Sequence, residues 1–344
     1  MKKRGRGIAC VQYQAHAPIP NPSGAVIDVL HDGTVNLAVG SADIGQGSNT
    51  ILAQIAAEEL GVPLESISVR SADTETTPYC VGTYGTRVTY VCGNAVRKAA
   101  SEAKEILLST GAELLQTDAD RLEIRNGMIC VRDEPEKAMA VADAAGYSIF
   151  MKGKPLLTSA TYSPHVIPID PETGQGEPAA AYSFGAQMAE VEVDTETGEV
   201  TVLKVIAAHD VGKAINPGFV ENQIEGGIQM GLGYALMEEV KVDRTGVILT
   251  PDFTDYLIPT SLDVPDIEVL CVETNEPTGP FGAKGIGEAV TCPTAPAIIN
   301  AVYDAVGVWI RNLPATPEKV LAALKQGQDK GMKDESISLR GCDA

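Results

Sequence analysis

One arrangement of elements occurs twice along this chain and limits the folds that it can adopt. Residues 24–39 form two β-rich runs about an Asp-Gly pair, and residues 186–208 form two more about a second turn. Such pairs of runs predict antiparallel hairpins. A polar, glycine-bearing loop follows each hairpin, and a helical pattern follows each loop, at 51–60 and 220–237. The repeat predicts an internal duplication, and hairpins grouped between long helices favour an α+β fold over a doubly wound parallel sheet.

The two units are predicted to meet in the proline- and glycine-bearing stretch 163–178. We therefore expect a first subdomain over residues 1–178 and a second over residues 179–326. The polar and charged residues 327–344 predict a disordered tail. Within the first subdomain the sequence also predicts a strand at 66–71, a long helix over 93–117, a hairpin about Asn126-Gly127, and Ser48 as the N-cap of the helix that follows it.

The charge balance excludes whole classes of partner. The chain of 344 residues has 26 Lys and Arg against 46 Asp and Glu, which gives a formal net charge of −20. Nucleic acids and anionic membranes are therefore not expected as partners. No apolar run approaches the length of a bilayer, and the basic start of the chain is not followed by the apolar core of a signal peptide. We expect a cytoplasmic location.

The residues that most often bind metals are scattered in this sequence. There are seven cysteines and four histidines, and no two cysteines form a C-x-x-C pair. Iron–sulfur and structural zinc sites are therefore not expected in this chain. We predict no metal-ligating residue, so that any metal must arrive inside a cofactor.

A glycine-rich loop at residues 280–288 holds the strongest candidate for catalysis. Three glycines surround Lys284 and precede Glu288, and a helical pattern of alanines and β-branched residues follows. Such a loop offers free N–H groups to an anion, and an acid on it is a candidate base. On spacing alone, a tight turn with a solvated surface acid is the commoner interpretation.

Two further loops and one helix carry polar residues suited to a ligand. Residues 45–47, Gly-Gln-Gly, present an amide that both donates and accepts hydrogen bonds, although turn glycines with a solvated glutamine are an alternative. The stretch 82–87 places small residues before an arginine that can hold the loop, bind a phosphate or lie at the surface. On the helix that begins near residue 220, Gln223 precedes Gly227 and Gly231, which allow close packing.

The amino-acid sequences of these segments resemble those of one protein family. Gly-Ala-Lys-Gly-Ile-Gly-Glu at 282–288, Gly-Thr-Tyr-Gly-Thr-Arg at 82–87, and the longer runs 42–61 and 209–231 resemble the molybdenum subunit of the xanthine dehydrogenase and aldehyde oxidase family. The resemblance extends over nearly the whole chain but covers only the second half of that subunit. The sequence at 82–87 most resembles the carbon monoxide and nicotinate dehydrogenase branches of the family. The chain as a whole is most similar to the medium molybdopterin subunit of nicotinate dehydrogenase.

The resemblance implies a role for each segment. It makes Glu288 the active-site base beside the molybdenum. It leaves Asp210 and Asn216 to shape their loop, and a lone histidine such as His209 is expected to be structural. Contacts to the cofactor are implied for Gly45, Gln46, Gly47, Gly82, Thr83, Tyr84, Gly85, Thr86, Arg87, Gln223, Lys284, Gly285, Ile286 and Gly287.

The same resemblance implies an activity and its partners. The reaction would hydroxylate a small nitrogen heteroaromatic substrate, a purine such as xanthine or hypoxanthine or else nicotinate, with oxygen from water. The cofactor would be molybdenum–molybdopterin in its cytosine dinucleotide form, with iron–sulfur clusters and FAD on partner subunits. Because the family's first half is absent here, the chain is either a separate subunit of a split enzyme or a fragment, and we expect a separate subunit to supply the first half. Aldehyde or carbon monoxide oxidation, and a non-catalytic scaffold role, remain alternatives.

Overall fold

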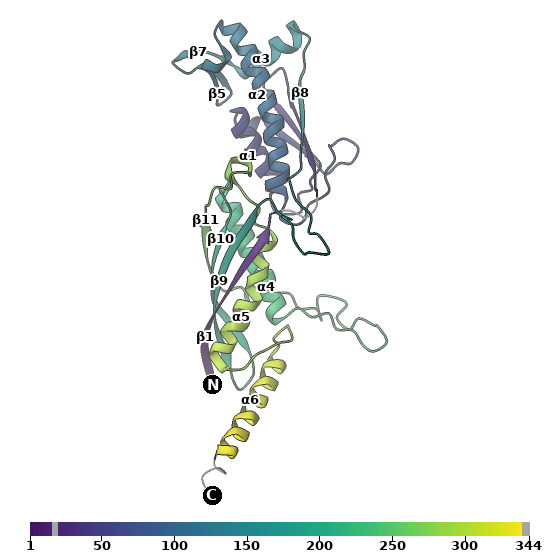
Figure 1. Ribbon diagram of the computed structural model, residues 1–344, viewed down its shortest axis with the longest axis vertical. Helices are drawn as coiled ribbons and strands as arrows, with labels where there is room; N and C mark the ends of the chain where they lie inside the picture. Colours follow the sequence, from purple (N-terminus) through teal and green to yellow (C-terminus); the bar gives the residue numbers. More distant parts are fainter. Residues whose placement is uncertain (16–19, 339–344) are drawn as a thin grey trace.

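Two four-stranded sheets with matching strand orders lie one beyond the other along an elongated molecule (Figure 1). The computed structural model describes residues 1–15 and 20–338, with side chains up to residue 327. The first sheet has the order β4-β3-β2-β8 and the second the order β11-β10-β9-β1. The strands are β2 Ser23–Val29, β3 Val35–Val39, β4 Ile67–Ser71 and β8 Leu156–Tyr162 in the first sheet, and β1 Lys2–Gln14, β9 Tyr182–Asp194, β10 Val200–Asp210 and β11 Asp266–Val272 in the second.

The duplication predicted from the sequence is present in both sheets. In each, an antiparallel hairpin leads into a helix, α1 (Ser48–Leu60) or α4 (Pro217–Leu236), and the next strand pairs in parallel with the second strand of the hairpin. A second long helix then packs on each sheet, α2 (Gly93–Leu115) on the first and α5 (Thr291–Val306) on the second. These features confirm the α+β class with two related subdomains, while the boundary between residues 178 and 179 stays a prediction.

Each sheet buries one face against its own helices. Leu37 on β3 and Leu52 on α1 belong to one apolar cluster, and Val191 on β9 and Ile298 on α5 belong to another. All four side chains are fully buried. Because successive strand residues point to opposite faces, the alternation read from the sequence decides which face each helix covers.

The first strand departs from the predicted division of the chain. β1 lies in the second sheet, paired antiparallel with β9 along its whole length, and not with the hairpin that follows it in sequence. Helix α5 lies directly on β1, because Gly5 and Gly7 have no side chain. A Cβ atom at Gly7 would lie 2.2 Å from the backbone nitrogen of Ala301. A strand whose partner is so distant along the chain leaves no signal in residue spacing, so the sequence placed it with the first subdomain.

The stretch after α2 holds elements that the sequence predicted only in part. The hairpin about Asn126-Gly127 is confirmed and belongs to a three-stranded sheet of order β5-β6-β7. The third strand and the helix after it have mixed polar composition and were not predicted. These elements are β5 Leu122–Arg125, β6 Met128–Val131, β7 Glu134–Ala140 and α3 Val141–Gly146.

The last helix occupies part of the segment for which the sequence predicted a disordered tail. Helix α6 spans Pro317–Ser338, so residues 327–338 continue a helix, and residues 339–344 lie outside the described part of the chain. The helix begins against the second core, where Val320 is fully buried. Ala323 and Leu324 also pack on this core, and the lysine, glutamine and glutamate residues further along have high helix propensity.

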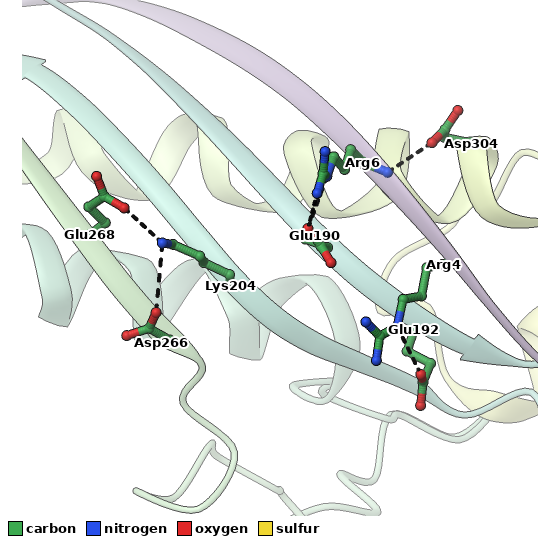
Figure 2. A network of polar contacts seen from close by, with 8 residues as sticks. All are labelled: Arg4, Arg6, Glu190, Glu192, Lys204, Asp266, Glu268 and Asp304. Carbon is green, nitrogen blue, oxygen red and sulfur yellow. Dashed lines mark hydrogen bonds and ion pairs between the residues drawn. The ribbon is translucent and has the colours of Figure 1, made fainter.

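The outer face of the second sheet is turned away from α4 and α5 and carries a ladder of ion pairs (Figure 2). On this face Arg6 pairs with Glu190 at 2.8 Å, and Lys204 pairs with Glu268 at 2.7 Å. Exposed pairs of this kind contribute little to stability. They do place opposite charges on neighbouring strands beside one another.

Candidate active site

A pocket of about 500 Å³ lies where the loops after β3, β4 and β10 meet the loop that precedes α5. The predicted site residues on its wall are Gln46, Thr83, Tyr84, Thr86, Arg87, Gln223, Lys284, Gly285, Ile286, Gly287 and Glu288. The predicted glycines at positions 45, 47, 82 and 85 belong to the same loops. The tertiary structure therefore gathers segments that lie up to about 240 residues apart around one space.

The Glu288 carboxylate is held at this pocket by the loop that contains residues 82–87. The N–H group of Gly85 donates to Oε1 at 3.0 Å, and the hydroxyl of Thr86 donates to Oε2 at 2.7 Å. Thr86 also accepts a hydrogen bond from the Glu288 N–H at 3.1 Å. Thr86 adopts a left-handed φ of 59°, which is unusual for a β-branched residue. These bonds to Glu288 stabilise the strained position and fix the direction of the carboxylate.

The approach of these two loops depends on a missing side chain. A Cβ atom at Gly285 would lie 2.0 Å from the carbonyl oxygen of Thr86. Any other residue at position 285 would push the Glu288 loop away from Thr86. The glycine was predicted to contact a cofactor, and its closest neighbour here is the opposite loop.

Two side chains beside Glu288 were not predicted from the sequence. Burial, together with the negative charge of Glu288 and a hydrogen bond to it, raises the pKa of Tyr13 to about 12. Burial and the same charge raise the pKa of the Cys292 thiol. Both groups therefore stay protonated at neutral pH and add no charge beside Glu288. Tyr13 lies on β1, so only the unpredicted crossing of that strand brings it here.

A buried ion pair fixes the loop that carries Glu288. The Lys284 ammonium group lies 2.5 Å from Oδ2 of Asp210 and donates to the carbonyl of Tyr182 at 2.8 Å. Both charged side chains are almost fully buried. Asp210 also accepts from the Gly212 N–H and the Thr274 hydroxyl, at 2.9 and 2.8 Å. Lys284 was predicted as a cofactor contact, but its ammonium group binds to groups of the protein. Asp210 lies at the end of β10 and not in the predicted loop.

A second buried network supports the short 3₁₀ turn Glu288–Val290. The Gln187 amide donates to the Val290 carbonyl at 2.8 Å and lies 3.1 Å from Nε2 of His209. Burial lowers the pKa of His209 to about 4, so its ring is neutral at neutral pH. His209 lies on β10, is fully buried and contacts the pocket only through these partners.

The loop at 42–48 makes many of its hydrogen bonds between its own residues. The Gln46 amide accepts from the Ile44 N–H at 2.7 Å and donates to the hydroxyl of Ser48 at 3.0 Å. Asp43, which was not predicted, accepts from the N–H of Asn49 at 3.1 Å and so satisfies the start of α1. The residue before the helix is Gly47, with a φ of 75°, so the prediction of Ser48 as N-cap was wrong. The left-handed turn needs glycine at the cap position and moves the helix start to Ser48.

The Arg87 guanidinium group donates its hydrogen bonds to other groups of the protein. It is fully buried and donates to the carbonyl of Gly82 at 2.7 Å and to the hydroxyl of Ser23 at 2.7 Å. Of the three roles left open for this arginine, the geometry favours the one that holds the loop. It also ties residues 82–87 to the start of β2.

Gln223 differs from Gln46, because its amide has no hydrogen-bond partner among the described residues. It lies on α4 at the wall of the pocket. One turn on, Gly227 packs against α5 as predicted: a Cβ atom there would lie 2.7 Å from Cβ of Val290. The neighbouring Gly226 faces the pocket and has no atom within 4 Å of the place of a Cβ atom.

In the described part of the chain, no group of three or more His, Cys, Asp or Glu side chains is gathered as a metal site. Within the same residues, none of the helices combines the length and the apolar character that a membrane span requires.

Comparison with known proteins shows the family to which the chain belongs. The model of a molybdopterin cofactor-binding domain matches residues 1–265. The putative xanthine dehydrogenase molybdenum-binding subunit XdhA of Escherichia coli strain K12 is 36% identical over 323 residues, which are 92% of this chain and 42% of that protein. The chain belongs to the molybdenum hydroxylase family.

Other molybdenum hydroxylases are similar in sequence and in structure. The nicotine 6-hydroxylase large subunit of Paenarthrobacter nicotinovorans is 34% identical, over 87% of this chain and 37% of that protein. Quinoline 2-oxidoreductase from Pseudomonas putida 86 superimposes with a TM-score of 0.86 at 31% identity, over 94% of this chain and 42% of that chain. The chain therefore spans less than half the length of these molybdenum hydroxylases.

The pocket wall fits the molybdopterin that this family binds. The free amide of Gln223 can donate to and accept from a polar ligand. Gly226, on the same wall, leaves open the volume that a side chain would fill. A pterin needs such a cradle, in which amide groups approach closely and no bulky side chain intervenes.

Proposed function

We propose that this chain supplies the catalytic part of the cofactor site in a molybdenum hydroxylase, with Glu288 as the general base. The observation that carries the proposal is the Glu288 carboxylate, directed by the Gly85 N–H and the Thr86 hydroxyl at the wall of the pocket. A carboxylate held by two donors keeps a fixed position from which it can accept a proton within about 2.6–3.2 Å. A surface acid would need neither the strained Thr86 nor the side-chain-free approach of Gly285.

The residues that would hold molybdopterin follow from the wall of the pocket. Gln223 would bind the pterin through its free amide, and the backbone of residues 285–287 and 45–47 would approach it closely. When bound, the cofactor would supply the redox chemistry and the oxygen-transfer centre. Tyr13 and Cys292, both protonated, would add no negative charge beside the Glu288 carboxylate.

The chain would work within a larger assembly. The chain matches 42% of the length of these relatives, and we propose a partner subunit as the source of the remaining part of the cofactor site. Iron–sulfur and FAD subunits would carry electrons away, and the cofactor would be the cytosine dinucleotide form. The net charge of −20 supports a cytoplasmic complex without nucleic acid or membrane partners.

The substrate that we propose is a small nitrogen heteroaromatic molecule, either a purine or a pyridine such as nicotinate. Relatives named for xanthine, nicotine and quinoline support this class. The test is dye reduction by the purified complex with xanthine, hypoxanthine, nicotinate, an aromatic aldehyde and carbon monoxide, together with molybdenum analysis. We expect turnover with at least one heteroaromatic substrate. Turnover with only the aldehyde or carbon monoxide would change the substrate class, and a molybdenum-free complex would refute the catalytic role.

The two glutamines are expected to respond differently to truncation. Gln223→Ala removes a free amide from the pocket and should lower molybdenum content per complex, because a lost contact to a buried ligand costs about 1–3 kcal/mol. Gln46→Ala should lower the thermal midpoint of the apo-complex as well, since Gln46 bonds within its own loop. Molybdenum analysis and thermal unfolding measure the two effects. Full metal occupancy in Gln223→Ala would exclude it as a cofactor ligand.

A further inference from the structure

A buried positive charge beside the pocket has no carboxylate partner. The Arg87 side chain is fully buried, and its acceptors are the carbonyls of Gly82, Asn21 and Pro22 and the hydroxyl of Ser23. No ion pair of Arg87 with an aspartate or glutamate occurs among the described residues. A buried guanidinium group is costly without a negative charge to balance it.

One group next to Arg87 can supply that charge. The Cys80 sulfur lies 3.1 Å from Nη1 of Arg87 and 3.2 Å from the hydroxyl of Ser23. The N–H of Gly82 also points to it, at 3.5 Å. Donors surround this sulfur, as a thiolate requires, and the side chain is only half-buried. A small reagent can therefore reach it.

A second thiol lies within reach of the first. The sulfur atoms of Cys80 and Cys92 are 4.0 Å apart, and Ser23 lies between them, with its oxygen 3.0 Å from Cys92. Cys92 is fully buried at the start of α2, so Cys80 is the sulfur that solvent meets first. A disulfide needs the two sulfurs to come about 2 Å closer, to about 2.05 Å.

We propose that Cys80 is a thiolate paired with Arg87 and that Cys80 and Cys92 form an oxidisable dithiol, which reacts with hydrogen peroxide to give a disulfide. The Cys80 sulfur attacks one peroxide oxygen, the O–O bond breaks, and hydroxide leaves to take up a proton as water. The Cys92 thiol then loses its proton, its sulfur attacks the Cys80 sulfur, and a second hydroxide leaves as water. Two electrons pass from sulfur to oxygen in all.

The titration of the two thiols has the direction that this reaction needs. Hydrogen bonds from Cys92 and Ser23 and the charge of Arg87 lower the pKa of Cys80, against the opposing effect of burial. The hydrogen bond to Cys80 and burial raise the pKa of Cys92. One sulfur is thus the nucleophile at neutral pH, and the other remains protonated until it resolves the oxidised form.

Oxidation would act on the candidate active site through Arg87. A disulfide removes the thiolate and leaves the guanidinium without a counter-charge, in the loop whose residues Gly85 and Thr86 hold Glu288. The effect on turnover rests on the proposed function. The thiol chemistry does not, and it can be measured without molybdenum.

The first test is alkylation of the full chain, as purified under reducing conditions, with iodoacetamide at about pH 6, followed by peptide mass spectrometry. Cys130 is the matched control, because it is also half-buried but its sulfur lies beside the Glu123 carbonyl and carboxylate, and the nearby Arg125 is paired with that carboxylate. We expect Cys80 to react about tenfold faster than Cys130 or more. In Arg87→Gln this advantage should disappear, and in Arg87→Lys it should largely remain. Equal rates for Cys80 and Cys130 in the wild-type chain would overturn the thiolate assignment.

The second test is treatment with hydrogen peroxide and non-reducing peptide mapping. We expect a peptide that links Cys80 to Cys92 and reverts with dithiothreitol. In Cys92→Ala the sulfenic acid should persist on Cys80 and be trapped by dimedone. Oxidation of the exposed cysteines Cys10 and Cys271 without this linked peptide would refute the dithiol. Because both tests begin with the wild-type chain, a variant that fails to fold leaves the proposal testable.

Discussion

Replacing Glu288 by glutamine is expected to lower turnover of the assembled enzyme by about 10²–10⁴-fold, the usual contribution of a general base. Glutamine fills nearly the same volume; its amide oxygen can still accept from the Gly85 N–H and its NH2 group can donate to the Thr86 hydroxyl oxygen, so the loop should keep its position. It cannot take up a proton. Turnover should be measured at saturating substrate, with molybdenum content determined on the same sample.

The control for this prediction is Glu58→Gln. Glu58 is exposed on α1, and no ion pair of its side chain occurs in the described part of the chain. Its replacement should leave turnover within error of the wild-type value. If Glu288→Gln behaved like Glu58→Gln while retaining its metal, Glu288 would have no part in proton transfer and the catalytic proposal would lose its main support.

Loss of the Lys284 ammonium group is expected to have the largest effect on stability. Lys284→Met keeps the length of the side chain but leaves the Asp210 carboxylate buried without its partner. Breaking a buried pair in this way costs about 3–5 kcal/mol. The free energy of unfolding should be measured by urea denaturation of the apo-protein in its purified complex. Lys213→Met is the control, because Lys213 pairs with Glu273 in solvent and its loss should have little effect.

A double-mutant cycle separates the interaction energy between Asp210 and Lys284 from the cost of burying a single unpaired charge. Asp210→Asn combined with Lys284→Met removes both charges, so the double variant should be more stable than Lys284→Met alone. A double variant as unstable as the sum of the two single variants would show that the groups do not interact.

The Asp210–Lys284 pair also predicts how the free energy of unfolding changes at low pH. Burial opposes ionisation of Asp210, but hydrogen bonds from Lys284, Gly212 and Thr274 outweigh it and lower the pKa of the carboxyl. A lowered pKa contributes stability that is present above the unfolded value of about 3.9 and is lost as the pH falls through the folded value. The difference in unfolding free energy between the wild type and Asp210→Asn should therefore narrow below about pH 4.

Local signals were enough to predict the repeated architecture. The hairpins at β2-β3 and β9-β10 and the helices α1, α2, α4 and α5 appear where turn residues and apolar spacing place them. These patterns act over a few residues, and each buries one face of an element, so they can be read without knowledge of its neighbours. The same reasoning found the glycine loops that surround the pocket.

Contacts between distant segments could not be predicted in this way. The crossing of β1 brings Tyr13 to Glu288, and the pairing of Asp210 with Lys284 joins positions 74 residues apart. The roles of Arg87 and Gln46 were equally open, because a polar side chain on a loop can turn to a ligand or to its own backbone. Only its neighbours in space decide which.

The sequence by itself determined the two related subdomains, the loops that carry the site and the family that they resemble, because these depend on residue type and short-range spacing. The tertiary structure decided which polar groups remain free for a ligand. It satisfied Gln46, Lys284 and Arg87 internally and left Gln223 and the Glu288 carboxylate on the wall of the pocket. The physical reason is that buried polar groups must find partners, and the fold determines which partners are within hydrogen-bond distance.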